Sequence, residues 1–245
     1  MTDRSSFLTH FNNLNLLSII DNTHTLSSDN PGYMNEDTVI ISKRIDIDNA
    51  IEYKVTLSEH YGTHIDAPLH YYENCLSVDK ILPKNLIGPA VVIDVQNNVE
   101  NNEDYELTIG DLNNWEKQYG DIPSGAIVIM FSGWQNRWKN PASYRNIQNG
   151  IYHFPGFSIN AIEWLLKNRV INGIGIDTLS VDKGCSTDFS VHKKILKEGK
   201  WCLENLCNLS NIPAFGSLMI VSPLKHKGGS GGPARIFTFK KKHRL

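Results

Sequence analysis

The stretch that most constrains the fold of this chain is HYGTHIDAPLHYY, which starts at position 60 and holds three histidines and one aspartate. An α-helix cannot present them together, because Asp66 would lie about 200° around the helix axis from His64 and Pro68 would break the helix. An extended backbone can, since positions 60, 64, 66 and 70 have the same parity and their side chains point to one side of a strand. We therefore predict an extended segment, with a sheet edge or a turn at Pro68 that would bring His70 in from another angle.

These side chains suit a divalent metal ion. Imidazole nitrogens and a carboxylate oxygen are ligands that zinc, manganese and iron all accept. Binding by His60, His64 and Asp66 alone would leave positions open for water, which is typical of catalytic rather than structural sites. Gly62 has the same parity, and its missing side chain would leave room between the two histidines. The alternative is a group of solvent-facing or hydrogen-bonded histidines, and the shared parity argues against it.

Strand and helix patterns alternate along the chain. Thr108 with Asp111 three residues later predicts a capped helix, Ser158 precedes a second helical pattern, and a third is expected over residues 187–197. No repeat or long linker divides residues 1–245, and the polar stretch 96–104 is interpreted as a surface insertion. We therefore predict one α/β domain. The expected strands are the apolar, β-branched runs at 38–42, 90–95, 126–131, 170–176, 218–221 and 235–239.

Composition excludes several classes of partner. The formal net charge is −2, so no overall field would attract nucleic acid or an anionic membrane. No apolar run approaches the ~20 residues of a membrane helix, and the N-terminal region lacks the apolar segment of a signal peptide. The four cysteines show no CxxC spacing, which fits reduced thiols. We therefore expect a soluble, cytoplasmic protein that acts on a small molecule.

The same residues resemble a known family. HYGTHIDAPLH matches the HxGTHxDxPxH motif of the metal-dependent cyclase family, which includes bacterial kynurenine formamidases and isatin hydrolases. The segments SGAIVIMFSGW, GIDTLSVD, His192 to LENL, and PLKHKGGSGGPAR resemble the later blocks of the family in the usual order. The resemblance implies an α/β fold with a partly open β-barrel core flanked by helices, and a homo-oligomer of at least two subunits.

The resemblance also implies a site. The positions that match His60, His64 and Asp66 bind metal in the formamidases, and those matching His192 and Glu204 complete a second position, so one or two zinc or manganese ions are expected per chain. By itself, Glu204 would be interpreted as a surface carboxylate. The position that matches His70 is the acid/base group, and an imidazole suits proton transfer at pH 7, although a purely structural histidine is the alternative. Candidate substrate contacts, each of which could instead be core packing, are Tyr33, Tyr61, Tyr71 and Trp134.

These features predict a metal-dependent hydrolase of a C–N amide bond. Metal-bound hydroxide would attack the carbonyl carbon, and His70 would protonate the departing nitrogen. The first candidate is an arylformamidase that acts on N-formylkynurenine. The alternatives are hydrolysis of a cyclic amide, as in isatin hydrolase, and a non-catalytic protein that binds a metal or ligand. Gly228, Ser230 and Gly232 match the GxSxG spacing of serine hydrolases, but no helix is expected after them, so we interpret them as a turn.

Overall fold

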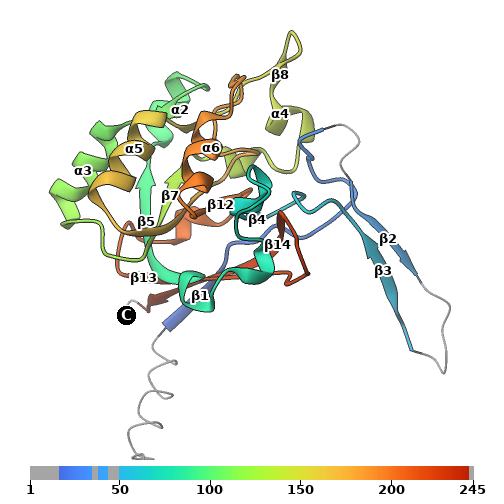
Figure 1. The fold of residues 1–245 in the computed structure, drawn as a ribbon. Helices are drawn as coiled ribbons and strands as arrows, with labels where there is room; N and C mark the ends of the chain where they lie inside the picture. The colour runs from blue at the N-terminus through green and yellow to red at the C-terminus, as the bar shows by residue number, and fades with distance from the viewer. Residues whose placement is uncertain (1–16, 35–37, 44–49, 243–245) are drawn as a thin grey trace, which may run out of the picture.

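The computed structural model describes residues 17–34, 38–43 and 50–242 (Figure 1). Its centre is a mixed sheet that closes into a barrel, because β4 pairs with β12 on one side and with β14 on the other. Around the barrel the strands follow the order β14-β13-β5-β7-β11-β12-β4. Their bounds are β4 (His64–Asp66), β5 (Ile87–Asp94), β7 (Ala126–Phe131), β11 (Ile171–Ile176), β12 (Trp201–Glu204), β13 (Ser217–Pro223) and β14 (Gly231–Lys241).

The predicted α/β fold with a β-barrel core is confirmed, but the barrel is closed rather than partly open. Closure depends on β14, whose 11 residues allow it to pair with β4 at its start and with β1 (Leu17–Asp21) near its end. Strands β5, β7, β11 and β12 are mutually parallel, whereas the pairs that involve β4, β13 and β14 are antiparallel. One long strand therefore converts an open sheet into a barrel.

Two apolar cores lie on the two faces of the barrel wall. In β7, Ile127 and Ile129 belong to the cluster that fills the barrel, whereas Val128 and Met130 belong to the cluster beneath the helices. A continuous apolar run is typical of a strand that is buried on both faces. This explains why the sequence predicts β7 at its observed bounds, 126–131.

Three helices cover one side of the barrel: α3 (Ile109–Tyr119), α5 (Ile159–Asn168) and α6 (Ser190–Lys197) (Figure 1). The predicted capping box at the start of α3 and the predicted cap of α5 are both present, whereas the third helix begins at residue 190, three residues later than expected. None of the described helices has the length and apolar character needed to cross a membrane. Shorter helices are α2 (Gln96–Asn101), α4 (Pro141–Arg145), η2 (Pro68–His70), η3 (Val78–Lys80), η4 (Pro83–Asn85), η5 (Trp134–Arg137) and η6 (Leu209–Asn211).

All six predicted strands are present, with differences at their ends. The strand expected at 38–42 is β2 (Ile40–Lys43), whose one partner among the described strands is β3 (Tyr53–Thr56). The two form a ribbon that extends away from the barrel (Figure 1). The insertion predicted at 96–104 is a surface segment that includes α2, which is anchored by the buried Val99. Two further short ribbons pair β6 (Glu106–Leu107) with β10 (Gly156–Phe157) and β8 (Ile147–Gln148) with β9 (Ile151–Tyr152).

Candidate metal centre and active-site pocket

The histidine motif folds as a turn, a short strand and a 3-10 helix rather than as one extended segment. His60 lies in a turn, His64 and Asp66 lie on β4, and Pro68 begins η2, which ends at His70. The predicted turn at Pro68 is confirmed. The prediction that shared parity on one strand brings all four groups together is wrong for His60 and His70, which reach the site because the chain bends on either side of β4.

Gly62 serves the turn rather than the space between the histidines. Its φ is +67°, a left-handed conformation that residues with a side chain rarely adopt. A Cβ atom there would lie 2.6 Å from Leu26 Cδ2, so the predicted role of this glycine is corrected. Its carbonyl oxygen faces the site, at 2.9 Å from both His64 Nδ1 and Asn205 Nδ2.

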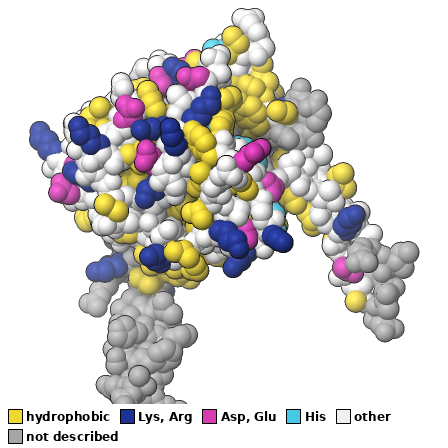
Figure 2. Space-filling view, in the orientation of Figure 1, with side chains coloured by type: hydrophobic (Ala, Val, Ile, Leu, Met, Phe, Trp, Pro, Cys, Tyr) yellow, Lys and Arg dark blue, Asp and Glu magenta, His cyan; other side chains and the backbone are white. Residues whose placement is uncertain are grey.

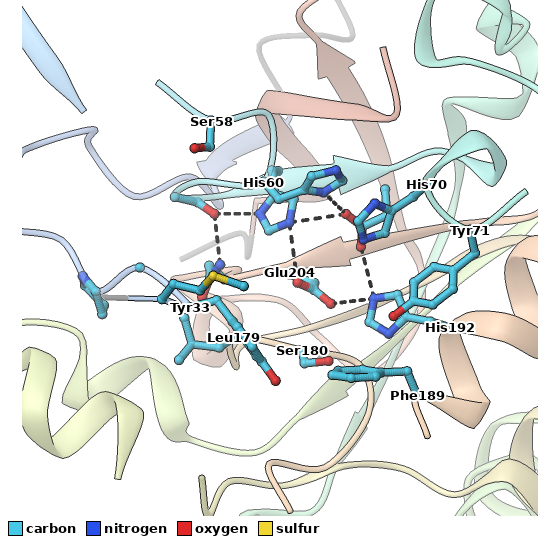
Figure 3. Close-up of a pocket in the computed structure, with 17 residues that line it drawn as sticks. Tyr33, Ser58, His60, His70, Tyr71, Leu179, Ser180, Phe189, His192 and Glu204 are labelled. Atoms are coloured by element: carbon cyan, nitrogen blue, oxygen red, sulfur yellow. Dashed lines mark hydrogen bonds and ion pairs between the residues drawn. The ribbon is translucent and has the colours of Figure 1, made fainter. Parts of the chain in front are cut away.

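The polar groups of β4 and β12 lie on the outer face of the barrel. Ile65 and Leu203 belong to the cluster that fills the barrel, so the residues on either side of them face outward. In the antiparallel pair of β4 and β12, Glu204 is opposite His64. His192 comes from α6 and completes the group (Figure 3).

Two imidazoles and two carboxylates converge in this space. His64 Nε2 lies 3.3 Å from Asp66 Oδ1 and 3.4 Å from Glu204 Oε2. His192 Nε2 lies 3.1 Å from Glu204 Oε1 and 3.4 Å from Asp66 Oδ2. All four residues are buried, with at most 5% of their surface exposed. The structure thus brings together four of the five predicted ligands around one small volume, and the fifth, His60, contacts Asp66 Oδ1 through Nδ1 at 2.5 Å.

The second ring nitrogen of each buried histidine is held by an acceptor. His64 Nδ1 faces the Gly62 carbonyl at 2.9 Å, and His192 Nδ1 faces Asp182 Oδ2 at 2.6 Å. A proton on Nδ1 leaves Nε2 with a free lone pair, which is the state that a metal ligand requires. The Asp182 carboxylate also accepts from the backbone N–H groups of Val191 and His192, at 2.9 and 3.0 Å, so one side chain both caps α6 and orients its histidine.

The chain's own residues fit a divalent cation. Asp66 Oδ2 is buried and makes no hydrogen bond in the described part of the chain, although it lies 3.4 Å from His192 Nε2. A buried charged oxygen without a hydrogen bond is normally costly. Two triads have ligand atoms within 4.8 Å of one another: His60, Asp66 and His70, and His64, Asp66 and Glu204. A set of imidazole nitrogens and carboxylate oxygens is appropriate for zinc or manganese.

The electrostatics of the cluster point to the same need for positive charge. Burial disfavours the charged form of His64, but Asp66 and Glu204 outweigh it and raise its pKa to about 10. Burial likewise opposes ionisation of Asp66, yet the charge of His64 and hydrogen bonds from histidines hold the pKa of this carboxyl well below its usual range. Without a cation the imidazoles would have to carry protons to balance two buried carboxylates, and a divalent ion would replace those protons.

His70 lies at the edge of the cluster and is exposed to the cavity. Its ring centroid is 3.9 Å from that of His60 and 6.2 Å from that of His192. Partial burial lowers the pKa of His70 to about 4, although the charge of Asp66 opposes the shift. The imidazole is therefore neutral at pH 7 and able to accept a proton.

A cavity of about 340 Å³ opens directly onto these groups (Figure 3). Tyr33 and Tyr71 line it, as predicted from the sequence. The ring of Tyr33 stacks on Tyr152 at a centroid distance of 4.9 Å, and the Tyr152 hydroxyl donates to the Tyr33 carbonyl. The other apolar lining residues include Met34, Leu179 and Phe189, and none of these three was predicted from the sequence.

Two of the predicted substrate contacts lie outside the cavity and are corrected. Tyr61 is fully buried, and its hydroxyl donates to the carbonyl oxygens of Ser27 and Asn30 at 2.9 and 3.1 Å. Trp134 is buried in the core beneath the helices, where its Nε1 donates to the Tyr144 carbonyl at 2.7 Å. For both residues the alternative interpretation, core packing, describes the structure.

A hydrogen-bonded group behind His60 was not expected from the sequence. Ser230 Oγ lies 2.9 Å from His60 Nε2 and donates to Glu59 Oε2 at 2.5 Å. Glu59 Oε1 in turn faces His226 Nε2 at 2.5 Å. Strand β14, not a helix, follows Ser230, so the turn interpretation of its GxSxG spacing is correct. The serine orients a predicted metal ligand.

Comparison with known proteins places this site in a family. The family model "Putative cyclase" matches residues 20–183, which is more than half of the chain. The chain belongs to the cyclase family. Among curated relatives, an isatin hydrolase of Roseibium aggregatum is 32% identical over 190 residues, which cover 74% of this chain and 72% of the relative. A kynurenine formamidase of Salinibacter ruber is 30% identical over 179 residues, which cover 73% and 75%.

Solved structures of cyclase-family proteins superpose over almost the whole chain. Isatin hydrolase A from Ralstonia solanacearum has a TM-score of 0.90 and 31% identity, with 98% of each chain covered. An isatin hydrolase bound to the product analogue thioisatinate has a TM-score of 0.92 and 28% identity, with 99% of this chain and 100% of that chain covered. The predicted family and the hydrolase class are therefore confirmed, while both kynurenine formamidase and isatin hydrolase occur among the relatives.

Proposed function

We propose that this protein is a metal-dependent hydrolase that cleaves the C–N amide bond of a small aromatic amide. The observation that carries the proposal is the buried group of His64, Asp66, His192 and Glu204, which opens into an aromatic-walled cavity with His70 at its edge. Relatives named isatin hydrolase and kynurenine formamidase support the reaction class.

One or two divalent ions, zinc or manganese, would be held by His60, His64, Asp66, His192 and Glu204. Asp66 and Glu204 each present one oxygen to His64 and the other to His192, so both carboxylates would help to hold a metal beside either imidazole. When bound, such an ion lowers the pKa of water and polarises a carbonyl group. Asp182 and the Gly62 carbonyl keep the two imidazoles oriented for this role.

His70 would move the proton that amide cleavage requires. A neutral imidazole can accept a proton from the attacking water and then donate it to the departing nitrogen, which is a poor leaving group without it. The position of His70 supports this role, because its ring faces the cavity next to His60. Glu59 and Ser230 hold the far side of His60, so the ring against which His70 packs has a fixed orientation.

The substrate is proposed from the cavity walls. Tyr33, Tyr71 and Phe189 surround a space suited to a planar aromatic ring. N-formylkynurenine is the first candidate, as the sequence indicates, and would release formate. Isatin is the second candidate, favoured by the isatin hydrolase structures that match almost the entire chain, and its ring would open without release of a fragment.

The test is metal analysis of the purified protein together with hydrolysis of both compounds before and after chelation. We expect one or two ions per chain, chelator-sensitive turnover of at least one compound, and a rate loss of about 10²–10⁴-fold in His70→Ala. His153→Ala is the matched control, since this histidine pairs with Asp104 outside the cavity. Metal-free protein that binds neither zinc nor manganese would overturn the proposal.

We further propose that the chain forms a homo-oligomer. The ribbon of β2 and β3 exposes Ile40, Ile41, Tyr53 and Val55, each with 49–58% of its surface accessible, and Figure 2 shows hydrophobic side chains along it. An isolated two-stranded ribbon is marginally stable, and exposed apolar surface of this kind marks interfaces. Light scattering of the purified protein tests this, and a monomer at micromolar concentration would contradict it.

A cytoplasmic location is also proposed. All four cysteines are free, which suits a reducing compartment. Charges of both signs are interspersed on the face shown in Figure 2, as expected for a protein that does not bind nucleic acid or a membrane surface. Fractionation of cells that express the tagged protein would test the location.

A further inference from the structure

Phe189 has a backbone conformation and a helix position that aromatic residues rarely occupy. Five non-glycine residues in the described part of the chain have a positive φ, and the other four are asparagines, at 146, 149, 205 and 208. Asparagine tolerates this conformation because its short polar side chain can bond locally, whereas a bulky aromatic residue gains no such compensation. Phe189, at φ 49° and ψ 45°, is also the N-cap of α6, a position that favours serine, threonine, aspartate or asparagine. Backbone strain of this kind clusters at functional sites.

Neighbouring side chains satisfy the groups that an N-cap residue would normally serve. The Phe189 N–H donates to Ser186 Oγ at 3.2 Å, and Asp188 Oδ1 accepts from the Ser190 N–H at 3.2 Å. The next two N–H groups of α6 donate to Asp182. The helix that carries His192 is therefore capped without the side chain of Phe189, and that side chain is available for another role.

The ring of Phe189 forms part of the cavity wall. Its centroid lies 6.2 Å from that of His192 and 6.5 Å from those of both Tyr33 and Tyr71. Figure 3 shows the ring below His192, with the two tyrosines on either side. Tyr33 and Tyr71 come from distant parts of the chain, so Phe189 joins the two walls at the end of the cavity nearest His192. In a right-handed conformation residue 189 would extend the first turn of α6, and its side chain would follow the helix surface instead.

We propose that Phe189 is a specificity-determining residue that closes the cavity over His192 and packs against the aromatic ring of the substrate. The strained backbone is retained because it presents the ring to the cavity while the next residue begins α6. The ligand class that this wall selects is an aryl amide or the aryl product of its hydrolysis. The inference deepens the proposed hydrolysis of an aromatic amide and rests on it for the identity of the ligand.

The test compares Phe189→Asn and Phe189→Gly, which suit a left-handed backbone but lack the ring, with the conservative Phe189→Tyr. The probes are anthranilate (2-aminobenzoate), with its Kd measured by calorimetry, and N-formylkynurenine and isatin, with KM and kcat measured on metal-loaded protein. For the asparagine and glycine variants we expect Kd and KM to rise about tenfold, kcat to change less than twofold, and Tm to stay the same or rise. The tyrosine variant should match the wild type.

The outcomes separate this inference from the proposed function. Unchanged Kd and KM in the asparagine and glycine variants would overturn the role of Phe189 while leaving the hydrolase intact. A fall in Tm and kcat together, with lost metal, would show a structural role and would equally overturn it. Weaker anthranilate binding in the two variants, with no turnover by the wild type, would support Phe189 and refute the proposed reaction. A wild type that binds none of the three compounds would overturn both.

Discussion

The two faces of the β4–β12 pair are equally buried and chemically opposite. Ile65 and Leu203 face the barrel interior with no exposed surface, whereas His64 and Glu204, at 2% and 5%, face α6. The inner face needs only apolar neighbours, because dispersion and the hydrophobic effect are not directional. The outer face holds charges, and their pairing within the chain leaves Asp66 Oδ2 without a hydrogen bond. Burial alone therefore does not distinguish the part of a strand that builds the fold from the part that supports chemistry.

The largest expected effect is a pH dependence of the stability of the metal-free protein, which arises from the protonation of histidine on the outer face. His64 has its pKa raised to about 10, so its contribution to stability is fully present below its unfolded pKa of about 6.5 and is lost as pH rises through 10. The loss could reach about 5 kcal/mol. Urea unfolding of chelated protein between pH 6.5 and 10 measures it, and His64→Gln should flatten the profile. An equally steep profile in that variant would assign the effect elsewhere.

Neutralising one carboxylate of the outer face should strongly reduce turnover. Asp66→Asn removes the negative charge and replaces one of the two carboxylate oxygens, which contact His60, His64 and His192. We expect kcat/KM to fall by about 10³-fold or more, equivalent to about 4 kcal/mol. Metal content and turnover are measured on the same preparation. Asp94→Asn, at the exposed end of β5, is the control and should retain both. Normal metal content with normal turnover in Asp66→Asn would contradict the assigned centre.

A substitution on the inner face should lower the free energy of unfolding without changing metal binding or turnover. Leu203→Ala leaves a cavity in a fully buried position and should reduce the free energy of unfolding by about 3 kcal/mol. The folded fraction should still bind metal and turn over substrate at near wild-type rates. Denaturant titration and metal analysis of the same samples check this. Loss of metal without loss of stability would show that the two faces are not separable in this way.

A smaller effect is expected at Asp182, which contacts the predicted ligand His192. Asp182→Asn weakens the bond that orients His192 and should reduce metal affinity by about 10–100-fold, equivalent to about 1.4–2.7 kcal/mol. Asp188→Asn is the matched control, because Asp188 also accepts from the start of α6 but does not touch His192. Competition with a chromogenic chelator gives both affinities. Equal affinities for the two variants would mean that Asp182 acts only as a helix cap.

The same contrast explains what could be predicted from the sequence. Patterns within one segment were informative: the apolar run of β7, the capping box of α3 and the histidine motif itself. Features that depend on pairing between segments far apart in the sequence could not be predicted. β12 was missed because only its place between β11 and β4 makes it a strand, and Asp182 was missed because its role depends on where α6 begins. The extent of one domain over residues 1–245 stays a prediction, since residues 1–16 lie outside the described part.

Aromatic residues illustrate the same limit at the level of side chains. Tyr61 and Trp134 lie close in sequence to site motifs yet point into packed regions, whereas Phe189 has no sequence signal and lines the cavity. The position of a residue next to a functional motif in the sequence says little about where its side chain points. That orientation depends on the turn that the backbone makes there. Only a positive φ at residue 189, which sequence patterns do not show, turns that side chain toward the site.

A calorimetric titration of chelated protein with zinc and with manganese, for the wild type and for Glu204→Gln, tests whether β4 and β12 hold a metal centre. We expect one or two ions per wild-type chain with at least one of these metals, and weaker or fewer binding events in the variant, because Glu204 contacts both buried histidines. Absence of binding by folded wild-type protein, or identical binding by the variant, would contradict the claim that the outer face of β4 and β12 is a metal centre.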